Sequence, residues 1–209
     1  MSQRPDFGEL SLSRPLEPSM LEAYSAGPVR TLEEYQQAMA LRAAVYLAEQ
    51  DCPYDEEYDG NDFSCTHFLV KAGGRPAGTC RVRWFAGFAK IERSTILPAF
   101  RGTPALRVLM AETCEVISRK GYRVALAQIQ SRLWPVWSRV FRCRLVHGRE
   151  NFAFSGFDYC EMEIPIAPHP QALTIRADPL QIIRPEGRWD EPGVLDRSAS
   201  RPTGEVQAA

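Results

Sequence analysis

The sequence predicts an α/β protein with a mixed, mostly antiparallel sheet flanked by helices. Hydrophobic periodicity gives the order helix, three strands, helix, strand, helix and two strands along the chain. A turn at Arg101-Gly102 joins the third strand to a central helix, which leads into the next strand. A helix in this position is a crossover connection, so we expect helices on both faces of the sheet.

Length, charge and cysteine usage narrow the classes of protein. The 209 residues suit one domain with tails, and the formal net charge of −1 argues against a dedicated nucleic-acid binder. No apolar run reaches about 18 residues, so we expect no membrane span, and the start of the chain lacks the apolar stretch of a secretory signal. The six scattered cysteines form no C-x-x-C pair, and the three histidines lie apart. These features predict a cytoplasmic protein with reduced thiols and no metal site.

We expect one domain over residues 28–166. Residues 1–27 and 192–209 are rich in polar residues and predict poorly ordered tails. Residues 167–191 contain scattered apolar side chains and are expected to pack on the domain or on a partner. In the second case this extension would form a homodimer.

The first half of the domain reads as a helix, an acidic loop and three strands. Thr31 is expected to cap a helix over 32–49, with Glu34 reaching back to complete a capping box. The apolar face of this helix is predicted from Leu32, Tyr35, Met39, Ala43 and Tyr46. Residues 51–65 predict a loop, and 66–72, 77–85 and 89–97 predict an antiparallel strand meander.

The second half predicts a long helix, a strand, a short helix and two more strands. The long helix starts near 103, ends at Lys120-Gly121 and is expected to bury Leu106, Leu109, Met110 and Ile117. A strand over 122–130 and a short helix over about 131–140 follow. The last strands are expected over 144–154 and 157–165.

The Arg101-Gly102 turn is the strongest functional signal in these elements. A glycine-containing turn at a helix N-terminus presents backbone N–H groups and the positive end of the helix dipole. Such a site favours phosphate groups, so the joint predicts a phosphate-bearing cofactor.

A second motif precedes the strands. Glu49-Gln50 is followed by Cys52-Pro53-Tyr54 and then by Asp59-Gly60-Asn61-Asp62. This spacing resembles the ElaA-type branch of the GCN5-related N-acetyltransferase (GNAT) superfamily, whose signature is Arg-x-x-Val-Phe-x-x-Glu-Gln-x-Cys-Pro-Tyr and then Asp-Gly-x-Asp. The resemblance covers about residues 30–165. It implies a sheet with a V-shaped splay between two central parallel strands. It also implies acetyl-CoA, or another acyl-CoA, as co-substrate and a small-molecule amine as acceptor.

The resemblance also implies which residues bind the cofactor. The pantetheine arm would pair with Ile96 and Leu97, and the pyrophosphate would sit on Arg101, Gly102, Thr103, Pro104, Ala105 and Leu106. Two departures stand out in the turn, because Pro104 and Leu106 replace small residues of the family pattern. Pro104 suits the first helical position but removes one N–H, and a lost charge-assisted bond weakens binding by about 1.5–3 kcal/mol.

A third departure lies in the short helix. Trp137 falls nearest to the tyrosine that many GNAT enzymes use to protonate the departing thiolate. An indole N–H cannot supply a proton near neutral pH, so we expect Trp137 to pack against the acyl chain or the core.

Two carboxylates are candidate catalytic groups. Glu92 precedes the cofactor turn and could deprotonate the amine, directly or through water, or could simply pair with Arg81 or Arg93. Glu49 is the second candidate, because a carboxylate at a helix C-terminus opposes the helix dipole.

The acceptor would be recognised by the acidic loop and the strand beside it. Asp59 and Asp62 belong to an acidic run that could attract a cationic amine, or could be a solvated loop. Gln128 ends the strand expected to splay from the cofactor strand, where it could contact substrate or cap the edge.

The leading hypothesis is an acyl-CoA-dependent N-acyltransferase that moves acetyl from acetyl-CoA to a small amine or amino group. One alternative is an N-acyl amino acid or homoserine-lactone-type synthase that uses longer acyl donors. The other is a catalytically impaired GNAT-shaped binding or scaffolding protein, which Pro104, Leu106 and Trp137 favour.

Overall fold

The computed structural model describes residues 18–201, which form an eight-stranded sheet. The strand order is β1-β2-β3-β4-β5-β8-β6, and β7 also pairs with β8. Paired strands run antiparallel except β4 and β5, which confirms the predicted fold class. The strands are β1 (Tyr24–Pro28), β2 (Thr66–Ala72), β3 (Arg75–Phe85), β4 (Phe88–Ile96), β5 (Val124–Gln130), β6 (Arg144–Leu145), β7 (Phe152–Phe154) and β8 (Phe157–Pro165).

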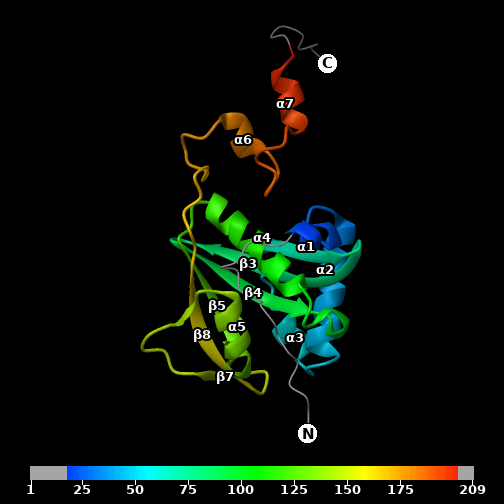
Figure 1. Cartoon of the computed structure of the whole chain (residues 1–209), viewed down its shortest axis with the longest axis vertical. Helices are drawn as coiled ribbons and strands as arrows, with labels where there is room; N and C mark the ends of the chain where they lie inside the picture. Colours follow the sequence, from blue (N-terminus) through cyan, green and yellow to red (C-terminus); the bar gives the residue numbers. More distant parts are fainter. Residues whose placement is uncertain (1–17, 202–209) are drawn as a thin grey trace.

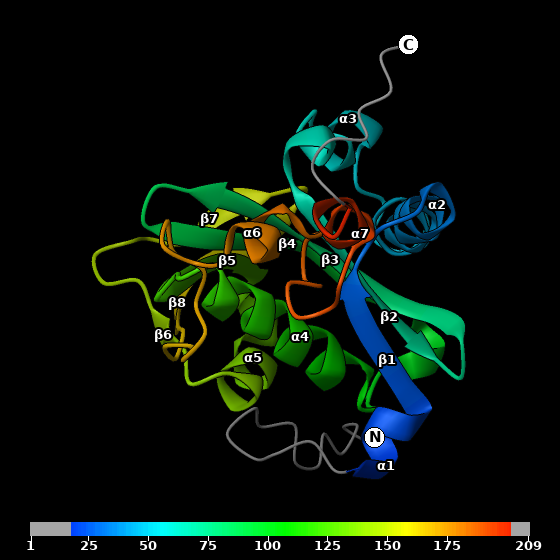
Figure 2. The same cartoon turned by 90° about the horizontal axis from the view of Figure 1, so that it is seen from above.

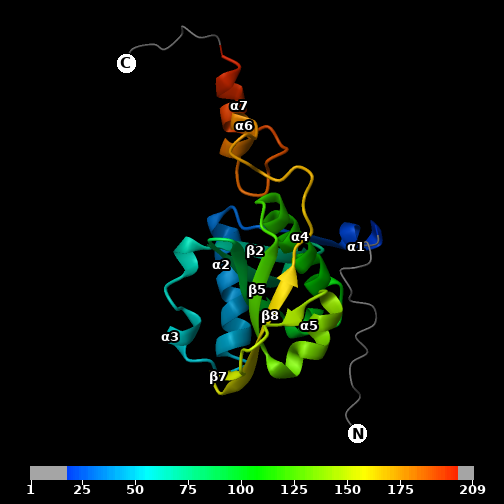
Figure 3. The ribbon, with the colours of Figure 1, turned by 90° about the vertical axis from the view of Figure 1, so that its left-hand side faces the viewer.

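Helices cover both faces of this sheet (Figure 1). Figures 2 and 3 show α2 and α3 on one face and α4 and α5 on the other. Helices α6 and α7 extend past one end of the sheet (Figures 1 and 3). The helices are α1 (Pro18–Ala23), α2 (Leu32–Arg42), α3 (Tyr54–Glu57), α4 (Ala105–Arg119), α5 (Trp134–Val140), α6 (Pro179–Ile183) and α7 (Val194–Ala199).

The hydrophobic core lies between α4 and the sheet. Leu109, Met110 and Ile117 are fully buried there, as the helical spacing predicts, and Leu106 packs partly buried against the same cluster. The helix begins at Ala105 rather than near 103, because the preceding residues form the turn that leads into it.

The first helix differs more from its prediction. Thr31 Oγ1 accepts a hydrogen bond from the Glu34 N–H at 3.1 Å, which confirms the cap, but the Glu34 carboxylate accepts from Arg30 N instead of the capping residue. The α-helix ends at Arg42 and continues as a π-helical turn over Ala43–Leu47. The predicted apolar face is wrong in part: Leu32 is exposed, whereas Ala38, Leu41, Arg42 and Val45 are buried. A pattern of apolar residues does not include Arg42, so it cannot predict that this arginine is on the buried face of the helix.

The ordered sheet starts before residue 28. Strand β1 pairs with β2 from Tyr24↔Ala72 to Pro28↔Phe68, so part of the expected N-terminal tail forms an edge strand. Tyr24 and Ala26 pack against the core. Two apolar side chains are too few for hydrophobic periodicity to predict a strand in this segment. The rest of the expected tail, residues 1–17, lies outside the described residues.

The C-terminal extension packs on the domain. Trp189 is buried in the core cluster, and Leu173 N donates to the Arg119 carbonyl at 2.7 Å. Arg119 also forms an ion pair with Asp190 at 2.6 Å. Helix α7 lies within the stretch expected to be disordered, whereas residues 202–209 fall outside the described part of the chain.

The last predicted strands are also refined. Instead of one strand over 144–154, the chain forms the short strands β6 and β7, which both pair with β8. Gly148 sits between them with φ 74°, a conformation that breaks a strand.

The two parallel strands part along their length. Pairing between β4 and β5 runs only from Ala89↔Ala125 to Ile91↔Ala127. Just beyond, Arg93 adopts a left-handed conformation with φ 52°, and the β3–β4 register shifts. The V-shaped splay expected from the resemblance is therefore present.

The other side of β4 stays tightly held by β3. A Cβ at Gly78 would lie 2.6 Å from the Thr95 carbonyl oxygen, so only glycine permits this approach. The splay consequently opens toward β5 alone.

Candidate active site

Two adjoining cavities open where β4 and β5 part. The smaller, about 90 Å³, lies in the splay and reaches Trp137. The larger, about 310 Å³, lies beside it over the sheet. The two cavities share seven lining residues: Tyr46, Gln50, Ile91, Glu92, Arg93, Gln128 and Tyr159. A ligand in the splay and a ligand in the larger cavity would therefore meet at these residues.

Besides the segment from Tyr46 to Cys52, three parts of the chain build the larger cavity. Lys90 and Glu92 of β4 and Gln128 of β5 come from the sheet. The segment around α3 adds Glu56, Glu57 and Asp59, and the β7–β8 hairpin adds Phe152, Phe154 and Ser155. A hydrogen bond from the Ser155 hydroxyl to the Glu56 carboxylate ties the last two parts together.

The π-helical turn brings Tyr46 to this site. The N–H groups of Ala48 and Gln50 donate five residues back, to Ala43 O and Val45 O. Such turns occur frequently at functional sites, because the extra residue redirects the side chains of the helix. The Tyr46 hydroxyl donates to the Ser94 carbonyl of β4 at 3.3 Å, and burial raises its pKa. It is therefore a neutral hydrogen-bond donor at the start of the splay.

The predicted cofactor turn has the expected backbone. Gly102 has φ 76°, which explains the glycine after Arg101. The Arg101 guanidinium reaches across to the Glu49 carboxylate at 2.5 and 2.7 Å and donates from Nε to the Ile96 carbonyl at 3.1 Å. The Arg101 hydrogen bond lowers the pKa of Glu49. Glu49 lines neither cavity, so the structure places it beside the turn rather than at the site where the cavities meet.

Pro104 stands one position earlier than expected. It immediately precedes α4, and its carbonyl accepts the first helical hydrogen bond from Val108 N at 2.9 Å. The Ala105 N–H donates to Thr103 Oγ1 at 3.3 Å. The Leu106 N–H belongs to the first helical turn, where no intrahelical carbonyl is available to it.

At the end of β4, before this turn, the backbone edge that faces β3 is already hydrogen-bonded. Leu97 N donates to the Ala77 carbonyl at 2.9 Å, and Ile96 is paired with Gly78 of β3. Their β5-facing edge lies beyond the last β4–β5 pair, Ile91↔Ala127.

Glu92 lies at the meeting point of the cavities among three cations. Its carboxylate contacts Arg81 at 2.9 Å, Lys90 at 2.8 Å and Arg83 at 3.8 Å. Burial acts to raise the pKa of Glu92, but Lys90 and Arg81 outweigh it and leave the pKa lowered. Glu92 is therefore ionised near neutral pH and is both a site residue and a partner of Arg81.

The acidic loop is held by arginines. Asp59 contacts Arg81 at 2.5 Å and Arg93 at 3.2 Å, whereas Asp62 contacts Arg42 at 2.5 Å and Arg81 at 2.9 Å. Burial acts to raise the pKa of Asp62, but its hydrogen bonds from Arg42 and Arg81 lower it overall. Asp59 lines the larger cavity, whereas Asp62 is not among its lining residues. The carboxylates thus face inward and are not a freely solvated loop.

Gln128 and Trp137 occupy the β5 side of the splay. Gln128 lines both cavities, and its amide donates to Glu161 at 2.7 Å. Trp137 is buried, lines the smaller cavity and stacks on Phe141 with ring centroids 5.3 Å apart. The expectation of a packing position is met, because Trp137 is part of the core cluster.

The sequence patterns missed Tyr159. This side chain lies opposite Gln130 in the β5–β8 pairing and lines both cavities. Its half-buried ring contacts Phe152 and Phe154, at centroid distances of 5.9 and 5.7 Å. Burial raises the pKa of the Tyr159 phenol. Alternating aromatics near the chain's last hairpin were visible in the sequence, but nothing there indicated that they face the splay.

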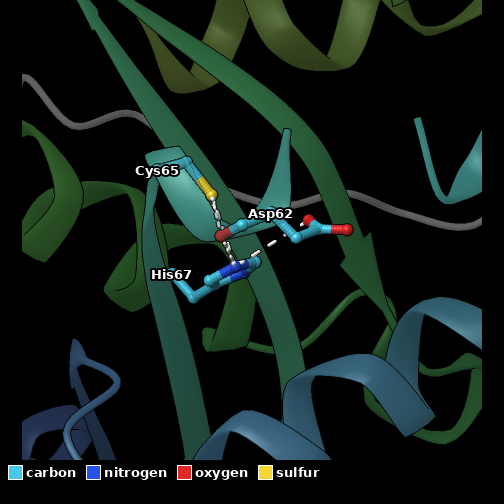
Figure 4. A group of neighbouring side chains, drawn as sticks. All are labelled: Asp62, Cys65 and His67. Carbon is cyan, nitrogen blue, oxygen red and sulfur yellow. Dashed lines mark hydrogen bonds and ion pairs between the residues drawn. The ribbon is translucent and has the colours of Figure 1, made fainter. Parts of the chain in front are cut away.

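One three-residue group has the composition of a metal site. Ligand atoms of Asp62, Cys65 and His67 lie within 4.8 Å of one another (Figure 4). Two arginines already bind the Asp62 carboxylate, and burial raises the pKa of Cys65 to about 11, so the thiol keeps its proton. His67 Nε2 lies 3.1 Å from the Asp62 carbonyl oxygen and 3.3 Å from the thiol. The Cys65 thiol and His67 Nε2 thus form a hydrogen-bonded cluster with the Asp62 carbonyl, whereas the buried His67 Nδ1 has no hydrogen-bond partner among the described residues. The protonated thiol and the paired carboxylate do not favour a cation.

Two further findings concern the chain as a whole. All six cysteines are free. Within residues 18–201, no helix combines the length and apolar character that a membrane crossing requires.

Comparison with known proteins supports the predicted class. No protein-family model matches the sequence. A Bacillus subtilis (strain 168) protein named as an acetyltransferase is 30% identical over 92 residues, which cover 43% of this chain and 63% of that protein. The crystal structure of Escherichia coli ElaA superimposes with a TM-score of 0.59 at 20% identity, over 68% of this chain and 97% of ElaA. FeeM, an N-acyl amino acid synthase from uncultured soil microbes, has a TM-score of 0.58 at 12% identity, over 68% of this chain and 90% of FeeM.

The parted β4–β5 pair and these similarities define a protein with the GNAT fold. The fold that the resemblance implied is thereby confirmed, and ElaA is among the structural neighbours. The chain spans just under two thirds of the first curated relative, 63% of its length.

Proposed function

We propose that this protein is an acyl-CoA-dependent N-acyltransferase that transfers acetyl from acetyl-CoA to a small amine or amino group. The observation that carries the proposal is the splay itself, with a cavity between β4 and β5 where their pairing ends. Unpaired strand backbone can hydrogen-bond to the amides of a pantetheine arm, as an added strand would. The adjoining larger cavity then receives the acceptor.

In this proposal the cofactor runs from the splay to the start of α4. Its pantetheine arm pairs along Ile96 and Leu97, and Trp137 lines the acyl end. Its pyrophosphate lies on the turn and helix start formed by Arg101, Gly102, Thr103, Pro104, Ala105 and Leu106. The Glu49 carboxylate, bound to Arg101 at the turn, acts here as a positioning group.

The acceptor must lose a proton before it attacks, because an alkylammonium has a pKa of about 10. Glu92 lies where the cavities meet and is the candidate base. Its lowered pKa makes it a weak base, which favours proton transfer through a water rather than direct abstraction. Asp59 and Gln128 contact the acceptor, and Asp62 supports Asp59 through their shared partner Arg81.

Tyr159 supplies the proton that Trp137 cannot. The amine nitrogen attacks the thioester carbonyl, the C–N bond forms and the C–S bond breaks. The departing CoA thiolate takes the phenolic proton, and Tyr159 regains one from solvent. Its position on both cavities supports this role, since the Tyr46 hydroxyl is already bound to the Ser94 carbonyl.

Calorimetric titration with acetyl-CoA tests the proposal, followed by detection of free CoA thiol in the presence of a panel of amines. We expect saturable binding and acceptor-dependent release of CoA. No heat of binding and no thermal stabilisation at millimolar acetyl-CoA would contradict the proposal.

The alternative with longer acyl donors rests on the fold shared with FeeM. The small volume of the splay cavity, about 90 Å³, and the buried Trp137 at its wall favour a short acyl group instead. Equal turnover of acetyl-CoA and octanoyl-CoA would support the alternative.

A dimer through the C-terminal extension is also part of the proposal. Ile182 and Ile183 of α6 and Leu195 of α7 are about half exposed. Light scattering of the unmodified protein and of the Ile183→Glu variant tests the dimer. A point substitution is used because truncation of the extension would also remove the core residue Trp189.

The free thiols agree with a reducing, cytoplasmic setting.

A further inference from the structure

Most of the acidic charge around the larger cavity is already paired within the protein. Glu57 contacts Arg42 and Arg93, and Asp59 contacts Arg81 and Arg93. A polyamine would have to displace an arginine to gain an ion pair with Glu57 or Asp59, so these two carboxylates give it little net attraction. Glu56, which accepts a hydrogen bond from Ser155, is the remaining carboxylate of the α3 segment at this cavity.

Positive charge is in excess at one side of the same cavity. Arg83 of β3 and Lys90 of β4 are cross-strand partners, and both line the cavity. Among the described residues, Glu92 is the one carboxylate that either side chain contacts. Arg81 binds the same carboxylate but is also paired with Asp59 and Asp62, so Arg83 and Lys90 share with it a single, already engaged counter-charge.

Arg83 is the least satisfied of these cations. Its guanidinium lies 3.8 Å from Glu92, which is longer than a hydrogen bond, and it stacks over the Phe85 ring at 4.9 Å. The side chains of Arg83 and Lys90 are 29% and 19% exposed, so both reach the cavity while remaining partly shielded from water. A partly desolvated pair of cations is a suitable receptor for a carboxylate.

The position of this pair fits the direction of the reaction. Along β4, Lys90 comes before Glu92, and the splay opens after Ile91. A carboxylate held at Arg83 and Lys90 therefore directs the other end of a small acceptor past Glu92 toward Gln128 and Tyr159, where the cavities meet.

We infer that the acceptor carries a carboxylate as well as its amine, that is, an amino acid, with the carboxylate bound by Arg83 and Lys90. This inference rests on the proposed N-acyltransferase function and names its acceptor class. The cavity volume of about 310 Å³ is at the lower end of the range for small-ligand sites, about 300–1,000 Å³, which suits a molecule of this size.

Matched pairs of acceptors test the inference. Each amino acid is compared with the amine that its decarboxylation yields, such as lysine with cadaverine and ornithine with putrescine. CoA release is measured at saturating acetyl-CoA. We expect kcat/KM to be about 10- to 150-fold higher for the best amino acid than for its amine, the range of one charge-assisted hydrogen bond. Equal or better use of the decarboxylated amines across the panel would overturn the inference.

Variants locate the effect. Arg83→Gln and Lys90→Gln should each lower the ratio of kcat/KM for the amino acid to kcat/KM for the matched amine about 10-fold or more. The ratio is the readout because Lys90 also lowers the pKa of Glu92, and a change in that base affects both acceptors alike. Arg75→Gln is the control, because Arg75 is an exposed arginine at the other end of β3. Unchanged amino acid selectivity in both cavity variants would contradict the assignment. Arg83→Lys serves if Arg83→Gln does not fold.

Acetyl-CoA calorimetry on every protein separates the two proposals. If the unmodified protein binds no acetyl-CoA, the N-acyltransferase function fails. If it binds acetyl-CoA and acetylates only amines without a carboxylate, the function stands and the acceptor assignment fails.

Discussion

Arg42 illustrates how single residues of this chain combine burial with charge. Its side chain is fully buried, yet it binds Glu57 at 2.5 Å, Asp62 at 2.5 Å and the Glu57 carbonyl at 2.9 Å. Through these contacts one arginine of α2 holds the whole acidic segment against the sheet. The same segment forms a wall of the acceptor cavity, so Arg42 supports the site without lining it.

Replacing Arg42 should therefore be costly. We expect Arg42→Met to lower the free energy of unfolding by about 3 kcal/mol, the lower end of the range for breaking a buried ion pair, because the buried Glu57 loses Arg42 and keeps only Arg93 as a cationic partner. Urea denaturation measures the loss. Arg123→Met is the control, since Arg123 is exposed and its replacement should change stability by less than about 0.5 kcal/mol. Similar stabilities of the two variants would show that the buried pair contributes little.

Tyr159 is the residue on which the chemical step depends. We expect Tyr159→Phe to lower kcat about 100-fold or more, the usual contribution of a general acid, with little change in acetyl-CoA affinity. Steady-state kinetics and calorimetry measure the two quantities. Tyr122→Phe is the control, because Tyr122 stacks on Trp84 and lines neither cavity. An unaltered kcat for Tyr159→Phe would move the proton donor elsewhere, for example to solvent.

Among the elements, β4 has the most demanding role. It pairs closely with β3 on one side, while on the other its pairing with β5 ends at Ile91. The sequence predicted the strand within one residue at each end, because its apolar run is bounded by Gly87 and Pro98. It could not show the left-handed Arg93, since the backbone conformation there depends on contacts with Glu57 and Asp59 far away in the chain.

The close β3–β4 approach makes Gly78 a test of this element. We expect Gly78→Ala to destabilise the protein by about 1–3 kcal/mol, because the added methyl meets the Thr95 carbonyl oxygen and Ile96. Thermal and urea unfolding measure the change. The matched control is Gly27→Ala in β1, where a Cβ meets nothing within 4 Å. If both substitutions are equally mild, β4 has room to shift and its close packing on β3 is not required.

At the scale of the whole molecule, the linked charges of the α3 segment, β3 and β4 tie stability to pH. Burial acts to raise the pKa values of Asp59, Asp62 and Glu92, but their cationic partners lower them overall. A carboxylate whose pKa is lower in the folded than in the unfolded chain contributes stability above the unfolded pKa. That contribution is lost as the pH falls through the folded pKa.

We therefore expect the contribution of these carboxylates to be undiminished from pH 7 to about pH 5 and to fall progressively below about pH 4, from the unfolded pKa values of Asp and Glu down to the lowered folded values. Urea denaturation at a series of pH values measures this, with Asp62→Asn as the comparison. The variant should be less stable at pH 7, and the difference should shrink as the pH falls below about 4. A difference that is as large at the lowest pH at which the protein still folds as it is at pH 7 would mean that Asp62 acts through packing rather than charge.

The sequence by itself determined the order of elements, the α4 face with Leu109, Met110 and Ile117, the Gly102 turn and the family resemblance. All of these depend on neighbours within a few positions of the chain, where periodicity and turn chemistry act directly. Only the tertiary structure decided which charges are neutralised, that Tyr159 reaches the splay, and that Arg83 and Lys90 lie together in the acceptor cavity. These depend on strand register and on ion pairs between distant segments, and no local pattern encodes either.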